Sequence, residues 1–411
     1  ALPVTAVAPA NAAADVLVRG APGRVLVLST AAFTLLFAVW LMFGMLGKPI
    51  RAELGLSTSQ LYWLGAAAVL SGSLFRLPFG ILAERFGGRR IMIALLLWTA
   101  LPTALVAFAQ GFGHLLALAL LFGIAGNSFS VGIAWNAAWF PPARKGLAMG
   151  VFGAGNVGAS VTKLLGPLLI ASLPAAGLLG GLLPGGWRAI PLLYAVALIA
   201  MAAAVWLGTP TPDRTPGGSR PVRDMLRPLR ETRVWRFGLY YVVVFGAYVA
   251  LSLWLPGYFQ DVHGCSLAVA GLLTALFIFP ASLLRPLGGW LSDRYGARPV
   301  TYAAFIGILL LAMPLALSGA KPFVLPLWLT TTLITLIGVG MGVGKASVYR
   351  YIPEYYPHDV GAVGGLVGTL GALGGVVLLP AIGAVEAAGL RSGAFALLAV
   401  LVGGCLLWLQ V

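Results

Sequence analysis

SLFRLPFGILAERFGGRR at residues 73–90 and SLLRPLGGWLSDRYGAR at residues 282–298 are two copies of one pattern, 209 residues apart. Aligned without gaps, the copies place Arg76 over Arg285, each inside an apolar stretch, and repeat an acid–arginine pair in the loop that follows. An arginine inside a membrane span costs roughly 2.5–3.5 kcal/mol on insertion scales and by default indicates a functional site. The repeat therefore predicts two matched halves that present positive charge to a shared cavity, and that cavity should receive an anion.

The composition of the chain is that of a membrane protein. Its 411 residues are 60% hydrophobic and only 9% charged, with a mean hydropathy of +0.97, which excludes a soluble globular protein. A spanning helix needs about 20 mainly apolar residues, whereas barrel strands show about ten in alternation. The apolar runs are of the helical kind, so we expect an all-α membrane protein with no barrel. The twelve predicted transmembrane helices cover residues 25–47, 59–83, 91–109, 113–138, 146–170, 188–208, 235–257, 266–291, 299–318, 324–350, 360–385 and 391–410.

Basic residues are distributed unevenly among the loops. With the N-terminus inside, 16 of the 26 lysines and arginines fall on cytoplasmic segments and five on the opposite side. This bias places both termini in the cytoplasm and predicts a multi-pass protein of a bacterial plasma membrane. It also accounts for the net charge of +15 by orientation in the lipid bilayer, without a nucleic-acid partner. The two cysteines lie near different span ends and do not indicate a disulfide framework.

One long polar stretch, rich in Pro, Gly and Arg, divides the spans into six and six. A second, weaker sequence match links the halves, since Trp139-Phe140-Pro141 corresponds to Tyr355-Tyr356-Pro357. Two parallel six-helix halves with a central cytoplasmic loop describe a major facilitator transporter. The predicted divisions are a cytoplasmic tail at 1–24, a first half at 25–208, a linker at 209–234 and a second half at 235–411.

The loop at the end of each repeat reads Gly-x-x-x-[Asp/Glu]-Arg-x-Gly-x-Arg. It resembles the signature that the major facilitator superfamily carries between its second and third helices. Its presence in both halves extends the resemblance over the whole chain. We expect its charged residues to make cytoplasmic contacts that hold one conformation closed, rather than to contact substrate: Glu84, Arg85, Asp293 and Arg294.

Every ionisable group placed well inside a predicted span is a cation: Arg76, Lys163, Arg285 and Lys345. No Asp, Glu or His accompanies them, so a substrate anion would supply the missing negative charge. The arginines lie roughly 10 Å from the cytoplasmic ends of their spans, near the depth at which transporter sites are built. A guanidinium keeps its proton and matches planar oxyanions. We expect no catalytic or metal site, no cofactor and no enzyme activity.

Glycine-rich spans 5 and 11 carry a more specific signal. Span 5 contains GAGNVG at 153–158, followed by Pro167, and span 11 reads GAVGGLVGTLGALGGVVLLP at 361–380. These runs resemble the signatures of the nitrate/nitrite porter family within the major facilitator superfamily. Small residues also let helices pack closely, so packing and cavity lining remain alternative roles. The glycines expected to act in gating are Gly150, Gly153, Gly158, Gly368, Gly371 and Gly375.

The resemblance implies a substrate site between the halves. Arg76 and Arg285 match the two arginines that grip the anion in that family. Lys163 and Lys345 depart from the family pattern, in which neutral polar residues stand, and would add positive field or carry a co-transported proton. The remaining residues of the implied site are Asn127, Gly155, Asn156, Tyr241 and Phe245.

The sequence therefore predicts a secondary active transporter of nitrate and/or nitrite, monomeric, working by alternating access. Nitrate/nitrite exchange and nitrate/proton symport both remain open. The rival functions are a carrier of the same fold for carboxylate or phosphate, an anion channel and, more remotely, a membrane-embedded sensor or enzyme. Arg350 and Glu354 are spaced for an i, i+4 ion pair at a helix end, away from substrate.

Overall fold

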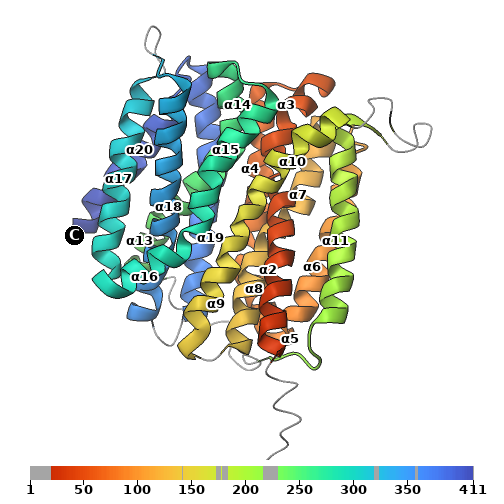
Figure 1. The fold of residues 1–411 in the computed structure, drawn as a ribbon, viewed down its shortest axis with the longest axis vertical. Coiled ribbons are helices and arrows are strands. Elements are labelled where there is room, and N and C mark those ends of the chain that lie inside the picture. Colours follow the sequence, from red (N-terminus) through yellow and green to blue (C-terminus); the bar gives the residue numbers. More distant parts are fainter. Residues whose placement is uncertain are drawn as a thin grey trace, which may run out of the picture.

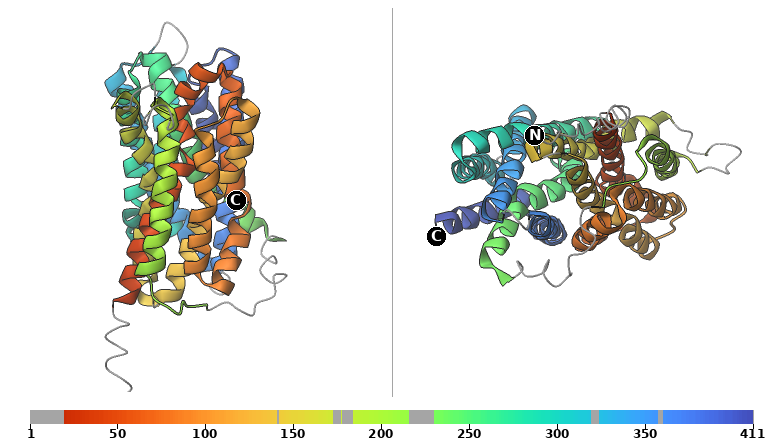
Figure 2. Two further views of the ribbon diagram at one scale, coloured as in Figure 1. Left: turned by 90° about the vertical axis from the view of Figure 1, so that its right-hand side faces the viewer. Right: turned by 90° about the horizontal axis from the view of Figure 1, so that it is seen from below.

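Two groups of helices lie side by side, and their helices run roughly parallel to the long axis of the molecule (Figure 1). The computed structural model describes residues 20–140, 142–172, 177, 184–215, 230–318, 324–356 and 360–410. Most of the predicted tail and the middle of the predicted linker, residues 216–229, lie outside the described residues. The first half begins at α2 and ends at α11, and the second runs from α13 to α20 (Figures 1 and 2).

The helices have the following bounds. The first half contains α2 (Ala21–Trp40), α3 (Phe43–Leu54), α4 (Thr58–Leu74), α5 (Arg76–Phe86), α6 (Gly88–Val106), α7 (Phe112–Gly123), η1 (Ile124–Asn127), α8 (Ser128–Trp139), α9 (Pro142–Ala154), η2 (Gly155–Val157), α10 (Gly158–Ser172), η4 (Gly186–Arg188) and α11 (Ala189–Gly208). The second half contains α13 (Thr232–Tyr241), η6 (Val242–Gly246), α14 (Ala247–His263), α15 (Leu267–Leu283), α16 (Arg285–Tyr295), α17 (Ala297–Leu317), α18 (Leu327–Tyr355), α19 (Val360–Ala387) and α20 (Gly393–Gln410).

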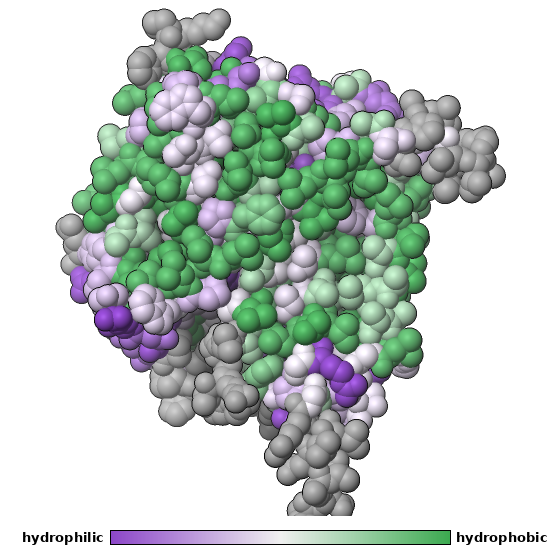
Figure 3. Space-filling view, in the orientation of Figure 1, coloured by the Kyte–Doolittle hydropathy of each residue, from purple (hydrophilic) through white to green (hydrophobic). Residues whose placement is uncertain are grey.

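By length and composition, nine apolar stretches among the described helices could cross a membrane, or up to eleven if each of two bent helix pairs forms one span. The twelfth predicted span corresponds to α20, whose apolar part, Gly393–Leu409, is shorter than the other spans. Apolar side chains form a broad belt around the visible face, with polar residues gathered at its two ends (Figure 3). Large apolar side chains such as Leu207 and Val400 are 81% and 75% exposed, as expected where lipid replaces water.

The sequence repeat is also a repeat of backbone geometry. At one end of the repeat, Gly55 and Gly264 both have φ +66°, and Ser57 and Ser266 cap the next helix with their side chains. At the other end, Gly87 and its counterpart 209 residues later both have φ +90°. Left-handed backbone of this kind strongly favours glycine. The two halves therefore share the same chain path on either side of the arginines.

We call the end of the bundle that carries the predicted linker the linker side. Acidic side chains there hold both ends of the linker. Asp213 accepts hydrogen bonds from Trp135 Nε1 (3.1 Å) and Trp139 Nε1 (2.9 Å). At the other end of the linker, Glu231 accepts from the Tyr356 hydroxyl at 2.5 Å. Burial, together with this carboxylate, raises the pKa of Tyr356 to about 12. Trp139 and Tyr356, which belong to the matching aromatic motifs of the two halves, thus each contact one end of the linker.

The opposite end of the bundle, which we call the far side, is tied across the two halves. Lys48 of α3 forms an ion pair with Asp261 of α14 at 2.6 Å. The carboxylate of Glu386 on α19 accepts hydrogen bonds from Trp254 Nε1 at 2.7 Å and from the Tyr62 hydroxyl of α4. These contacts close the far side between the halves.

One predicted ion pair is wrong. Arg350 Nε donates to the Asp293 carboxylate at 2.6 Å instead of pairing with Glu354. The reason is that α16 and α18 lie side by side, so an acid of the repeated loop reaches Arg350 across the helix interface (Figure 1). This contact involves a charged residue of the loop signature, and it lies within the second half.

Candidate functional site

The two repeated arginines begin two half-helices in the middle of the bundle. Arg76 is the first residue of α5 and Arg285 the first residue of α16. The helix directions change by 41° and 40° at the breaks before them, close to Pro78 and Pro286. The N-terminus of a helix carries unpaired N–H groups and the positive end of its dipole, a common site for anions in transporters. Each arginine is therefore placed at the start of a helix segment, next to a bend in its span.

Arg76 is completely buried, and two of its nitrogens have backbone partners. Nε donates to the carbonyl of Gly72 and Nη1 to that of Gly368 in the other half, each at 3.3 Å. Within the described part of the chain, Nη2 has no hydrogen-bond partner. The side chain is thus fixed in place with one donor group left over.

Phe129 of α8 brings the two arginines together. The guanidinium carbons of Arg76 and Arg285 each lie 5.5 Å from the centre of this ring. Arg285 is 8% exposed, and its Nη1 reaches the carbonyl of Gly153 in the first half at 3.5 Å. Two like charges from opposite halves thus share one aromatic ring in a region of weak screening. An anion between them would relieve their repulsion.

The predicted aromatic pair of span 7 lies beside this cluster. Phe245 is 5.0 Å from the guanidinium carbon of Arg76, and Tyr241 stacks on Phe245 at 5.1 Å with ring planes 9° apart. Tyr349 of α18 meets Tyr241 edge-on at 4.8 Å. Between Tyr241 and α14 the backbone forms the π-helical turn η6, a distortion that is frequent at functional sites.

The two lysines that depart from the family pattern have different surroundings. Lys345 Nζ donates to the carbonyl of Ala281 at 3.0 Å and lies 3.2 Å from the centre of the Tyr248 ring. Among the residues that the structure describes, Lys163 Nζ has no hydrogen-bond partner, although its side chain is fully buried. Only Lys345 is therefore part of a satisfied network.

Asn127 and Asn156 both lie in short 3-10 turns that interrupt spans 4 and 5. Asn127 Nδ2 donates to the carbonyls of Ser71 and Ile124, at 3.1 and 2.9 Å, which ties it to the first half. The backbone oxygen of Asn156 accepts from the Tyr248 hydroxyl at 3.3 Å. Both side-chain polar atoms of Asn156 lack a partner within the described residues.

The predicted gating glycines have different neighbours. A Cβ atom at Gly153 would approach the Arg285 guanidinium, and one at Gly371 would overlap the Tyr241 ring. Gly158, by contrast, packs against the backbone of α2 in its own half, as does Gly155 against α2 side chains. For the others, a Cβ would meet Pro286 at Gly150, Tyr349 and Arg76 at Gly368, and Val69 and Val249 at Gly375.

The interpretation of the sequence did not single out several residues of the cluster. Phe129 lies only two residues after Asn127, and Trp40 places its ring 5.6 Å from the Arg76 guanidinium. Tyr248 and Tyr349 contact Lys345 and Tyr241. Aromatic residues are common in the apolar spans of this chain, so only their packing distinguishes these four.

Comparison with known proteins identifies the family. A sequence profile of the Major Facilitator Superfamily matches residues 28–379 and 264–410. The chain belongs to the Major Facilitator Superfamily. The predicted fold class is confirmed, and the chain is a membrane transporter and not an enzyme.

Relatives place the chain more narrowly within that superfamily. It is 59% identical over 403 residues, 94% of this chain and 91% of the relative, to a "Probable nitrate/nitrite antiporter NarK1" of Thermus thermophilus. It is 34% identical over 358 residues, 85% of this chain and 86% of the relative, to a "Probable nitrate/nitrite transporter NarK2" of Mycobacterium tuberculosis. The resemblance to the nitrate/nitrite porters is therefore confirmed.

A solved structure of similar fold is a bacterial homologue of the human lysosomal transporter Spinster, in an inward-facing and occupied conformation. It covers 95% of both chains with a TM-score of 0.69 and 17% sequence identity. This likeness supports the major facilitator fold alone.

Proposed function

We propose that this chain is a secondary active transporter of nitrate and nitrite that works by alternating access. The observation that carries the proposal is the placement of Arg76 and Arg285, one from each half, over the single ring of Phe129. Nitrate and nitrite are small planar oxyanions, which suit the planar donor fork of arginine. The names of the relatives at 59% and 34% identity support the same substrates.

The arrangement suggests how the bound anion would drive the conformational change. Without an anion, the two guanidinium groups repel each other across the interface between the halves. A bound oxyanion accepts hydrogen bonds from both, including the unpartnered Nη2 of Arg76, and draws the halves together. The rings of Phe129, Tyr241 and Phe245 limit the space to a small ion and exclude bulkier carboxylates and phosphate. Closure with cargo bound is thereby favoured over closure of the empty site.

We further propose that the linker side faces the cytoplasm of a bacterium, across its plasma membrane, and that the protein acts as a monomer. The positive-inside bias of the sequence supports this orientation. The coupling is either exchange of nitrate for nitrite or symport of nitrate with protons.

Uptake of isotopically labelled nitrate into proteoliposomes tests the proposal. We expect saturable uptake that excess nitrite inhibits and that acetate and phosphate leave unchanged. Dependence on internal nitrite would indicate exchange, and stimulation by an inward proton gradient would indicate symport. Inhibition by phosphate or acetate instead would favour a carrier for another anion, and flux that does not saturate would favour a channel. Absence of nitrate flux under every gradient would overturn the proposed function.

A further inference from the structure

Three buried polar side chains without partners follow one another along span 5. They are Asn156, Ser160 and Lys163, which are 0%, 1% and 0% exposed. In the described part of the chain, no hydrogen-bond partner is found for Asn156 Nδ2 and Oδ1, Ser160 Oγ or Lys163 Nζ. We call these three residues the α10 row. They continue from the arginine cluster towards the far side.

The α10 row lies in the part of span 5 that packs against α15 of the second half. Ser160 and Lys163, three residues apart, share one face of α10, and Asn156 precedes them in the 3-10 turn η2. Gly153, near the end of α9 and before that turn, lies against the Arg285 guanidinium of the second half. Thr162 is directed into the first half, since its hydroxyl donates to the carbonyl of Ala38 and lies 2.5 Å from the Tyr194 hydroxyl of α11.

Elements of the second half cover the row. The backbone of Lys163 lies directly against Gly271 of α15. Nearer the arginines, the Tyr248 hydroxyl lies 3.3 Å from the Asn156 carbonyl and 3.2 Å from Ser282 Oγ. The row therefore lines the interface between the halves, along which an alternating-access carrier opens.

A structural role does not account for the row. Burying a polar group without a hydrogen bond is costly, and burying an unpaired charge is far more so. Lys345 shows how the same chain satisfies a buried lysine, with a carbonyl at 3.0 Å and an aromatic face at 3.2 Å. Lys163 has neither of these contacts among the described residues. The amide, hydroxyl and ammonium groups of the row are all donors that a small oxyanion would accept.

We propose that the α10 row is a second binding site for a small oxyanion, between the arginine pair and the far side. Lys163 supplies its charge, and Ser160 and Asn156 supply neutral donors. At 1.5 Å per residue, Lys163 lies roughly 10 Å beyond Asn156 along the helix, so an anion would meet the two in succession. The site lowers the electrostatic cost of separating an anion from two arginines. The inference rests on the proposed anion transport.

The test compares Lys163→Met and Ser160→Ala with the wild type and with Arg391→Gln. Methionine keeps the length of the lysine side chain and removes its charge. Arg391→Gln is the control. Arg391 is an exposed residue beyond α19, so this substitution removes one positive charge from the far side without changing the row. The measurements are the half-saturating nitrate concentration for proteoliposome uptake and the shift of the melting temperature produced by nitrate.

We expect Lys163→Met to raise the half-saturating nitrate concentration about tenfold and Ser160→Ala to raise it about threefold, with no change for Arg391→Gln. We also expect Lys163→Met to melt at or above the wild-type temperature without nitrate, because it removes an unpaired buried charge, and to show a smaller nitrate-induced shift. Unchanged half-saturation and an unchanged nitrate-induced shift would overturn the second site. Failure of the proposed function is distinct, because the wild type itself would then take up no nitrate.

Discussion

Arg76 and Arg285 occupy equivalent positions in the two halves, but the protein holds them differently. Arg76 is fully buried, donates to two backbone carbonyls and lies within 5.6 Å of three aromatic rings. Arg285 is 8% exposed, reaches one carbonyl at 3.5 Å and shares one ring. The first half thus offers a fixed guanidinium and the second half a more loosely held one. Under the proposed anion binding, we expect Arg285 to adjust to the anion and Arg76 to define its position.

Replacement of either arginine by lysine should produce the largest effect. Lysine keeps the charge but loses the planar donor fork, so we expect Arg76→Lys and Arg285→Lys each to abolish nitrate uptake in proteoliposomes. The two variants should also differ in stability. Arg76→Lys should also lower the melting temperature, because its partners lose their contacts, whereas Arg285→Lys should leave it near that of the wild type.

Arg214→Lys, on the linker side, is the control and should transport normally. Near-normal uptake by both buried variants would contradict the site itself. A larger loss of stability in Arg285→Lys than in Arg76→Lys would reverse the assignment of the fixed and the mobile arginine.

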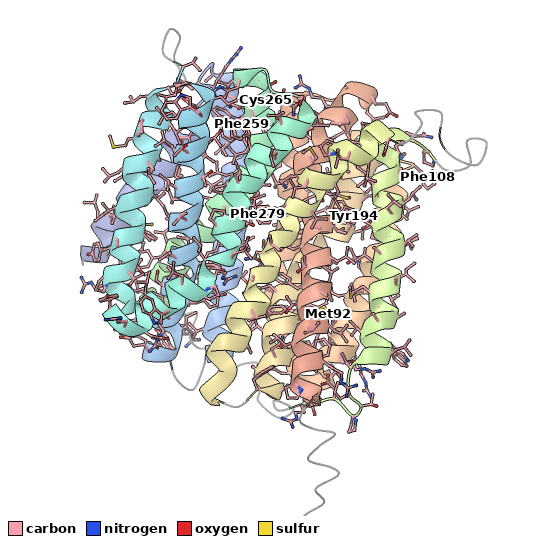
Figure 4. All side chains as sticks on the ribbon, in the orientation of Figure 1. Met92, Phe108, Tyr194, Phe259, Cys265 and Phe279 are labelled. Carbon is pink, nitrogen blue, oxygen red and sulfur yellow. The ribbon has the colours of Figure 1, made fainter. Side chains whose placement is uncertain are left out.

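The next largest effect should come from the ring that the arginines share. Phe129→Leu keeps an apolar side chain but removes the aromatic ring that both guanidinium groups contact, and each contact is worth about 0.5–2 kcal/mol. We expect the half-saturating nitrate concentration to rise about tenfold, with folded protein recovered in normal yield. Phe108→Leu, at an exposed position of the first half (Figure 4), is the matched control and should have no effect. Equal behaviour of the two variants would show that Phe129 serves only for packing.

The sequence predicted the arginines well because an arginine in an apolar run is rare and its repetition after 209 residues rarer still. The spans were predicted from apolar length, and the two halves from the polar stretch and the repeat. Phe129 could not be singled out, because only the crossing of two distant helices gives this ring its neighbours. The partner of Arg350 was missed for a similar reason, since the i, i+4 rule takes no account of α16 lying alongside.

The span 5 glycines also show why prediction from the sequence alone misses some contacts. Gly153 and Gly158 belong to one sequence run but point to different halves of the protein. The 3-10 turn at Gly155–Val157 interrupts the regular helix between them, so a face calculated for an unbroken helix does not continue through it.

Glycines beside the arginines provide a smaller and more selective test. In Gly368→Ala, the new methyl would lie 2.8 Å from the Tyr349 hydroxyl, which is itself bound to the Gly364 carbonyl. We expect about a fivefold loss of uptake, since the ring next to Arg76 must shift. In Gly153→Ala, the methyl meets Arg285 Nη1 at 3.1 Å, and the loosely held side chain should yield with a loss of about twofold.

Gly365→Ala is the control for the first of these variants, because its methyl would meet only a Leu77 methyl group at 3.6 Å. Its uptake should match that of the wild type. If Gly153→Ala were the more damaging of the two site variants, Arg285 would be the rigid member of the pair.

The smallest effects should come from the acids at the linker side. Asp213 accepts hydrogen bonds from the Arg89 backbone and from two tryptophans, whereas Asp293 forms one ion pair with an exposed partner. Asn replaces one acceptor oxygen with a donor, so Asp213→Asn should cost about 1 kcal/mol and Asp293→Asn less, since surface ion pairs contribute about 0–1 kcal/mol. We expect a lower melting temperature for Asp213→Asn and nearly wild-type melting and uptake for Asp293→Asn. An equal decrease of the melting temperature in both variants would mean that Asp213 and Asp293 hold the loops of the two halves equally firmly, although the two arginines are held differently.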